Sequence, residues 1–352
     1  ENPGSHRGFF IPEMRVSVVM PAHNAERTLS AAIESILSQK WTEFDFVIVD
    51  HESTDETPQI LRSAARQDPR ISLHRHDGTF VEAANLAWQK SSGDLIARMD
   101  SDDLAHPYRL AKQITFLKNN PDLAACGTLV SIVKRGENES VVTANGGYQR
   151  YEKWVNSVIS PDAIFRERFV DSPIPNPTAM IRRSVLEELG GYADPPWAED
   201  YDFWLRLLEA NHQLGKVDEI LLDWFDAPER STRQIERYEL TRFQEAKAHF
   251  LSRLDPIRKL GVTICGAGPI GKEMARFLNL EEIEVTAFCE VNERQIGNRI
   301  SGIPVFGQEA VAERNGETIL IGAVGQPGAR ARIRHLAEDA GYVEGDDFFC
   351  VA

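Results

Sequence analysis

The 352-residue sequence has few cysteines and no long apolar run. Its four cysteines lie far apart and form no metal-ligand spacing, a pattern typical of small buried side chains in a reducing compartment: Cys126, Cys265, Cys289 and Cys350. No apolar run approaches the roughly 18 residues of a membrane span, and no signal-peptide pattern is present. We therefore expect a cytoplasmic protein without a transmembrane segment.

Basic residues are also scarce. The sequence has 39 Lys and Arg against 54 Asp and Glu, a net charge of -15, which argues against a broad nucleic-acid-binding face but allows a local basic patch. The 42% hydrophobic and 26% charged residues are typical of a globular protein, and the length favours two domains over a single core. Residues 1–13, with Gly, Pro, Ser and His and little periodicity, are expected to be a disordered leader.

Strand-like and helix-like segments alternate four times before residue 101. The expected strands are 16–20, 46–50, 71–73 and 95–100. This alternation predicts an α/β fold, with a parallel sheet and helices on both of its faces. In such sheets ligands bind outside the carboxyl ends of the strands. Pro21, expected to end the first strand, lies at such an end with Asp50 and Asp100, so three polar loops should converge on one crevice.

The fourth strand runs into Asp100, Ser101, Asp102 and Asp103. Carboxylates this close repel one another unless a cation lies among them, and their oxygens suit Mg2+ or Mn2+. An ordinary solvated turn is the alternative, with Asp103 capping the next helix. The spacing alone does not separate a metal site from such a turn.

A second acidic pair, Glu199 and Asp200, follows Trp197 at the expected start of a helix. Acids are common there because the helix dipole favours their charged form. The pair is therefore either structural or, together with the strand-end acids, part of a reactive site.

A new α/β pattern begins after Asp255-Pro256. The strand 262–265 runs into Gly266-x-Gly268-x-x-Gly271, and Glu290 follows at about the distance of a ribose-binding acid. This context allows three functions for the module: an NAD site, binding of another nucleotide or a sugar, or a purely structural or partner-docking role. No partner residues for hydride transfer are evident in this part of the sequence.

Several motifs in this order resemble those of the family-2 glycosyltransferases over residues 16 to about 230. The motifs are 19–26, Asp50 with 53–55, 99–103, 176–183, 190–192 and 199–202. The resemblance implies a GT-A fold, that is, a nucleotide-diphospho-sugar transferase domain with a Rossmann-like mixed sheet, here followed by a smaller Rossmann-like α/β domain. It also implies inverting transfer from a nucleotide-diphospho-sugar, with a UDP-sugar favoured, assisted by Mn2+ or Mg2+.

The same resemblance implies a role for individual residues. Asp200 would be the catalytic base, Glu199 would support or orient the acceptor, and Asp102 with Asp100 would bind the metal. Acceptor contacts would come from Asn176, Thr178 and Trp197. The donor nucleotide would be bound by residues of four loops and helices: Pro21, Ala22, His23, Asn24, Glu26, Asp50, Ser53, Asn85, Asp100 and Ser101.

Three positions depart from the family pattern. His51 and Glu52 stand where the family usually has an acid and a glycine. The sequence therefore does not determine which nucleobase the donor carries. Ala84 replaces a common arginine before Asn85. Asp226 follows the last strand of this domain in place of an Arg or His, so it is a candidate third metal ligand.

The two-part organisation and three short motifs, at residues 151–154, 199–200 and 287–290, resemble a narrower group. Its members are beta-1,3-N-acetylglucosaminyltransferase-like proteins associated with glycosylation of queuosine in tRNA. The acceptor would then be a tRNA nucleoside instead of a glycan, glycolipid or small molecule. Phosphate contacts would come from basic residues that are otherwise solvated: Arg230, Arg233, Arg237, Arg242, Arg330, Arg332 and Arg334. A non-catalytic sugar-nucleotide-binding or scaffold protein is the other alternative.

We expect a catalytic domain over residues 14–232, a helical linker over 233–257 and a Rossmann-like domain over 258–352. The acceptor, the linkage and the oligomeric state do not follow from the sequence.

Overall fold

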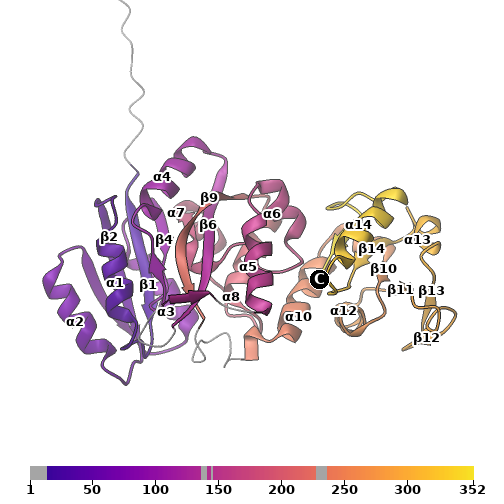
Figure 1. Cartoon of the computed structure of the whole chain (residues 1–352), viewed down its shortest axis with the longest axis horizontal. Coiled ribbons are helices and arrows are strands. Elements are labelled where there is room, and N and C mark those ends of the chain that lie inside the picture. Colours follow the sequence, from indigo (N-terminus) through magenta and orange to yellow (C-terminus); the bar gives the residue numbers. More distant parts are fainter. Residues whose placement is uncertain (1–13, 136–140, 144–145, 227–235) are drawn as a thin grey trace, which may run out of the picture.

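The computed structural model describes residues 14–135, 141–143, 146–226 and 236–352. The expected leader, Arg230 and Arg233 lie outside these residues. The described residues form two α/β units that lie side by side along the long axis of the molecule, with the helix α10 between them (Figure 1). All four cysteines are free and buried, as expected. Within the described ranges, no helix combines the length and the apolar character needed to cross a membrane.

The larger unit is built on a nine-stranded mixed sheet of order β3-β2-β1-β4-β8-β6-β9-β5, with β7 paired to β6. Its first four strands are parallel, as the alternation predicts, whereas β8 is antiparallel to both β4 and β6. The strands are β1 (Val16–Ala22), β2 (Phe44–His51), β3 (Ile71–His76), β4 (Leu95–Arg98), β5 (Leu104–Ala105), β6 (Leu123–Arg135), β7 (Val141–Thr143), β8 (Met180–Arg182) and β9 (Gln213–Phe225).

Pro21 does not end the first strand, contrary to the prediction. It lies within β1, opposite Val49 of β2. The neighbouring strand β4 ends at Arg98, opposite Val19, so one side of β1 is unpaired where the proline occurs. Proline is tolerated at such a position because its missing N–H removes no ladder bond on that side.

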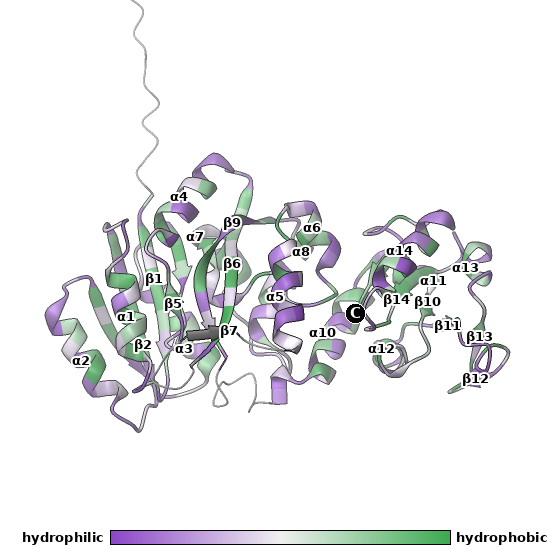
Figure 2. Cartoon of the chain, in the orientation of Figure 1, coloured by the Kyte–Doolittle hydropathy of each residue, from purple (hydrophilic) through white to green (hydrophobic). Residues whose placement is uncertain are grey.

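Helices cover both faces of this sheet, and two apolar cores lie between the layers. Figure 2 shows the apolar strands β6 and β9 beside the more hydrophilic helix α5. The helices are α1 (Leu29–Leu37), α2 (Thr57–Gln67), α3 (Phe80–Lys90), α4 (Arg109–Asn119), α5 (Gly147–Ser157), α6 (Pro161–Glu167), η2 (Asn176–Thr178), α7 (Arg183–Leu189) and α8 (Glu199–Glu209).

The second unit has a six-stranded sheet of order β12-β13-β11-β10-β14-β15, in which β12 alone is antiparallel to its neighbour. Its strands are β10 (Val262–Cys265), β11 (Val285–Cys289), β12 (Arg299–Ile300), β13 (Ile303–Phe306), β14 (Ile319–Gly322) and β15 (Phe348–Cys350). The helices from the linker onward are η3 (Glu236–Tyr238), α10 (Leu240–Ser252), α11 (Asp255–Leu260), α12 (Pro269–Leu280), α13 (Ala310–Glu313) and α14 (Ala329–Asp339).

The two units share one apolar cluster and a set of buried polar contacts. Trp197, just before α8, and Tyr201 of α8 belong to the same cluster as the inner residues of α10 and β10. Beside it, the buried Glu167 accepts hydrogen bonds from Arg334 at 2.6 Å and Arg330 at 3.2 Å. Lys247 Nζ of α10 donates to carbonyl oxygens of both units. The start of α8 is therefore fixed against the second unit.

Candidate active site

The loops that follow β1 and β2 are joined by hydrogen bonds. Asn24 donates its backbone N–H to Ser53 Oγ at 3.0 Å, and its Oδ1 accepts from the backbone of Thr54 at 2.8 Å. Asn24 has a φ of 44°, a left-handed conformation that asparagine tolerates better than most residues. His23 Nδ1 lies 2.5 Å from the carbonyl oxygen of His51. Two of the predicted nucleotide-binding loops therefore form one edge, as the parallel sheet requires.

Glu26 and Thr28 extend this edge. Glu26 Oε2 accepts from the backbone N–H of Glu56 at 3.0 Å, so this predicted donor-binding side chain supports the loop after β2. Thr28 Oγ1 donates to the carbonyl oxygen of Ser101 at 2.9 Å. The acidic loop after β4 is thereby tied to the loop after β1, and all three strand ends meet in one place.

Asp50 and Ser53 lie where the first two loops meet. Asp50 is buried, with 5% of its surface exposed, and Ser53 N–H lies 3.4 Å from its Oδ1. Neighbouring Glu52 has a φ of 49°, a conformation that the glycine usual in the family adopts more easily. Ala84, the second departure from the family pattern, is a buried residue of α3.

The acidic loop brings three carboxylates together. One oxygen from each of Asp100, Asp102 and Asp103 lies within 4.8 Å of the others, the single group of this kind among the described residues. Hard cations such as Mg2+ and Mn2+ take oxygen ligands in this way, so the residues fit a divalent ion. Asp103 is fully buried, and its Oδ1 accepts the N–H of Phe225 at 2.9 Å. Asp103 therefore also fixes the end of β9.

Two buried arginines, neither predicted from the sequence, lie behind these acids. The guanidinium of Arg98 lies 3.0 Å from Asp100 Oδ1, and only 3% of this side chain is exposed. Arg109 donates to the carbonyl oxygen of Arg98 at 2.6 Å. Burial lowers the pKa of Arg109 to about 10, so it stays charged at neutral pH. For Arg98, its position at the end of an apolar strand was a sequence signal, whereas Arg109 lies on the helix α4 and had no comparable signal.

Asp226, the candidate third ligand, is not part of the acidic group. It is buried just after β9, where its Oδ2 lies 3.2 Å from Lys134 Nζ. This pairing with a cation favours a structural role for Asp226.

Glu199 and Asp200 form the first turn of α8. Burial, followed by the charge of Glu199, raises the pKa of Asp200 to about 8, and the charge of Asp100 acts in the same direction. The charge of the acidic loop after β4 therefore contributes to the raised pKa of Asp200. Its Oδ1 also accepts the N–H of Tyr201 at 2.8 Å. Burial raises the pKa of Glu199 as well. The two acidic motifs, about one hundred residues apart in the sequence, thus act on one another electrostatically.

The predicted acceptor residues are buried and have partners within the protein. Asn176 Oδ1 accepts from Tyr192 OH at 3.2 Å, Thr178 Oγ1 donates to Pro175 O at 2.7 Å, and Trp197 Nε1 donates to Asp202 Oδ1 at 3.1 Å. The amide of Asn85 binds both backbone polar groups of Tyr192. These contacts give all four residues a role in holding the site together.

The glycine loop of the second unit has the close backbone approach that its motif predicts. A Cβ on Gly271 would lie 1.9 Å from the carbonyl oxygen of Gly266, so only glycine fits there. Above Gly268 the space is open. Glu290 Oε2 accepts the N–H of Ala267 at 2.9 Å, so this acid braces the loop itself.

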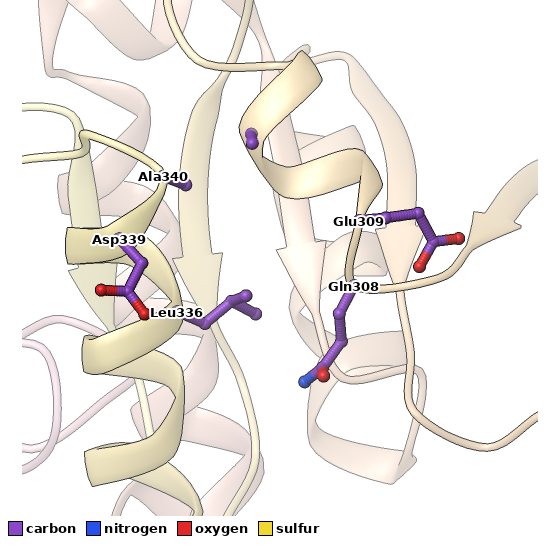
Figure 3. A pocket seen from close by; sticks show the side chains of 6 residues that line it. Gln308, Glu309, Leu336, Asp339 and Ala340 are labelled. Carbon is purple, nitrogen blue, oxygen red and sulfur yellow. The ribbon is translucent and has the colours of Figure 1, made fainter.

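A separate pocket of about 220 Å³ lies between α13 and α14 (Figure 3). Leu336 and Gln308 line it, while the carboxylate of Glu309 points away from it. None of its lining residues belongs to the glycine loop or to the acidic loops, so it is not part of either predicted site.

Most described residues of the proposed phosphate-binding set are paired with acids. Arg237 binds Asp194, Arg242 binds Glu236 and Glu245, and Arg330 and Arg334 bind Glu167. Arg332 is exposed. These four arginines therefore already have acidic partners within the protein, which reduces the positive charge that they offer to an RNA phosphate.

Comparisons with known proteins identify the family of this chain. The family model "Glycosyl transferase family 2" matches residues 17–190, and "CoA binding domain" matches residues 258–342. The putative glycosyltransferase EpsE of Bacillus subtilis is 32% identical over 213 residues, covering 59% of this chain and 71% of EpsE. The O-antigen biosynthesis glycosyltransferase WbnJ of Escherichia coli is 30% identical, covering 59% and 78%. The chain belongs to glycosyl transferase family 2.

Another relative matches over a smaller share of its own length. An uncharacterized glycosyltransferase of Haemophilus influenzae is 31% identical over 193 residues, which are 54% of this chain and 58% of that protein. The narrower resemblance to tRNA-queuosine enzymes finds no support among the relatives described here. S. aureus TarS 1–349 in complex with UDP-GlcNAc has a similar fold, with a TM-score of 0.54 and 18% identity over 76% of this chain and 72% of TarS.

Proposed function

We propose that this family-2 protein transfers a sugar from a nucleotide-diphospho-sugar to an acceptor hydroxyl by a metal-dependent inverting displacement. One observation carries the proposal: oxygens of Asp100, Asp102 and Asp103 lie within 4.8 Å of one another at the sheet edge where the loops after β1 and β4 are joined. The charge of Asp100 also contributes to the raised pKa of Asp200, which supports a role for the pair that opens α8 at the same edge. A metal-binding group and a proton acceptor are the two functions that such a displacement needs.

Asp102 and Asp100 would hold the metal, and the loops carrying Pro21, Asp50 and Ser53 would hold the nucleotide. A bound Mn2+ or Mg2+ would neutralise charge on the departing nucleoside diphosphate. S. aureus TarS, which has a similar fold, was crystallised with UDP and with UDP-GlcNAc, and this supports a UDP-sugar as the first donor to test.

Asp200 would accept the proton of the attacking hydroxyl. A carboxyl group whose pKa lies near the working pH is an effective general base, and the value of about 8 places Asp200 in this range. Its hydrogen bond with Tyr201 N–H fixes one oxygen, so the other is available for the acceptor.

We also propose the domain limits 14–232 and 258–352, with residues 233–257 as a linker. The start of the second sheet at Val262 and the CoA-binding match from residue 258 support the second limit. The glycine loop would bind either a nucleotide or a sugar, or it would have a structural role without a ligand.

Thermal unfolding with UDP-, GDP- and dTDP-sugars, each with and without Mn2+, tests the donor site. We expect metal-dependent stabilisation by one nucleotide class, and its loss in Asp102→Asn. Asp94→Asn is the matched control, because Asp94 is an exposed acid directly before β4, at the opposite end of the same strand. Absence of metal-dependent stabilisation in the wild type would contradict the proposed metal and donor site.

The Asp200→Asn variant tests the proposed role of Asp200 as the catalytic base. Donor-dependent stabilisation should persist while release of nucleoside diphosphate, measured across a panel of sugar acceptors, falls by at least about 100-fold. Unchanged release would show that another group accepts the proton.

A further inference from the structure

Tyr238 contacts the catalytic pair from outside the catalytic sheet. It ends the short helix η3, which leads into α10 and thus to the second unit. Its hydroxyl lies 2.8 Å from Oε2 and 3.0 Å from Oε1 of Glu199. Glu199 is only 3% exposed, so this phenol replaces water around a carboxylate that burial would otherwise disfavour in its charged form.

Arg237, the preceding residue, supports the same carboxylate. Its guanidinium lies 3.7 Å from Glu199 Oε2 and 2.6 Å from Asp194 Oδ1. Arg237 therefore links the loop before α8 to the first residue of α8. Hydrogen bonds from a phenol and a nearby cation both favour an ionised Glu199.

Aromatic packing holds this segment against α8. Tyr201 stacks on Phe243 of α10 with ring centres 5.3 Å apart and an interplanar angle of 21°. Trp197 lies 5.2 Å from the ring of His249. The backbone that carries Arg237 and Tyr238 is thus anchored directly to the helix that carries Asp200.

We propose that Tyr238 and Arg237 are positioning residues: they hold Glu199 ionised and oriented so that it aligns Asp200 for proton transfer. The inference rests on the proposed function, in which Asp200 is the base. It assigns the segment between the two units a part in the reaction, although neither residue touches the reacting atoms in this arrangement.

The charges around the pair determine the expected effect on pH dependence. Burial raises the pKa of Glu199, whereas the hydroxyl of Tyr238 and the charges of Arg237 and Arg98 act in the opposite direction. Burial and the charges of Glu199, Asp100 and Asp171 raise the pKa of Asp200. Loss of the Tyr238 hydroxyl makes Glu199 easier to protonate. A neutral Glu199 no longer repels charge on Asp200, so Asp200 should ionise at lower pH while losing its fixed orientation.

Release of UDP from UDP-N-acetylglucosamine with Mn2+, followed from pH 5 to 10, tests the inference. In Tyr238→Phe we expect kcat to fall about 10-fold, KM for the donor to stay within about 2-fold, and the acidic limb of the kcat profile to move to lower pH. Arg237→Gln should move the limb in the same direction. This second variant keeps the test valid should Tyr238→Phe fold poorly.

Two comparisons separate positioning from general loosening of α8. Tyr201→Phe removes a buried hydroxyl on the same helix, one that donates to Arg168 O at 2.7 Å, and should lower stability without moving the acidic limb. In a Glu199→Gln background, Tyr238→Phe should cause no further shift of the limb. An unmoved limb in Tyr238→Phe, or an equal shift with and without Glu199, would overturn the inference.

Asp200→Asn is assayed in parallel. If it still releases UDP at the wild-type rate, the proposed function fails and the inference falls with it. If it is inactive while Tyr238→Phe behaves as the wild type, the inference alone is wrong.

Discussion

Arg98 lies against Asp100 with 3.0 Å between Nη2 and Oδ1, at the point where β4 gives way to the acidic loop. Nη1 of the same guanidinium donates to the carbonyl oxygen of Met99 at 2.6 Å. The cation is buried, so its attraction to the carboxylate is weakly screened by solvent. Arg98 thus offsets part of the repulsion among the three acids when no divalent ion is bound.

Arg98→Met should therefore destabilise the protein in the absence of metal. We expect the free energy of unfolding to fall by about 2–4 kcal/mol, because a partly buried carboxylate loses its cation. Added Mn2+ should restore part of this loss, since the ion supplies the missing positive charge. Urea unfolding with EDTA and with Mn2+ measures both effects.

Arg206→Met is the control for that experiment. Arg206 donates to Asp202 at 2.7 Å on α8, and neither residue belongs to the acidic group. Its loss should lower stability equally with and without Mn2+. Equal Mn2+ effects in the two variants would contradict the role given to Arg98.

Asp102 and Asp103 should behave differently although they are adjacent. Asp103→Ala removes the acceptor of the buried Phe225 N–H, so we expect stability to fall by about 1–3 kcal/mol. Asp102→Ala concerns a half-buried residue and should chiefly abolish the stabilisation by Mn2+. Thermal unfolding of both variants without metal separates the two roles, and a larger loss for Asp102→Ala would reverse them.

Asp200→Asn should be more stable than the wild type at alkaline pH. The pKa of Asp200 is raised to about 8, so between about pH 4 and pH 8 the native state binds more protons than the unfolded state and stability falls as the pH rises. Asparagine avoids this loss. We expect an advantage of about 2–4 kcal/mol at pH 8.5 that shrinks toward pH 4, measured by urea unfolding across this range. A constant advantage would show that Asp200 does not titrate in this way.

Lys216 should produce a pH dependence of the opposite sign. It is buried on β9, where it donates to the carbonyl oxygen of Val155, and burial lowers its pKa to about 7. Above pH 7 the unfolded state binds the extra proton, so stability should rise up to about pH 10.5. Lys216→Met should reduce this slope by up to about 1.4 kcal/mol per pH unit. The exposed Lys90→Met is the control and should leave the slope unchanged.

Local patterns were sufficient to predict the sheet of the first hundred residues and the loops at its edge. Apolar runs that stop near Pro21, Asp50 and Asp100 predicted the carboxyl ends of three strands to within two residues, and parallel strands bring such ends together. The glycine loop was also predictable from a local pattern. Where a strand leads into a helix through such a loop, Gly271 lies too close to the carbonyl oxygen of Gly266 for any side chain to fit. The position of Pro21 within β1 was not, since it depends on where the neighbouring strand stops.

The sequence by itself determined the family, the two α/β units and the acidic residues that can meet at a strand edge, because these depend on residue type and short-range spacing. Only the tertiary structure decided which partners each acidic residue has. Phe225 is brought to Asp103, and Tyr238 to Glu199, from distant parts of the chain. Burial and such partners set the ionisation of a carboxyl group, and both are properties of the folded state.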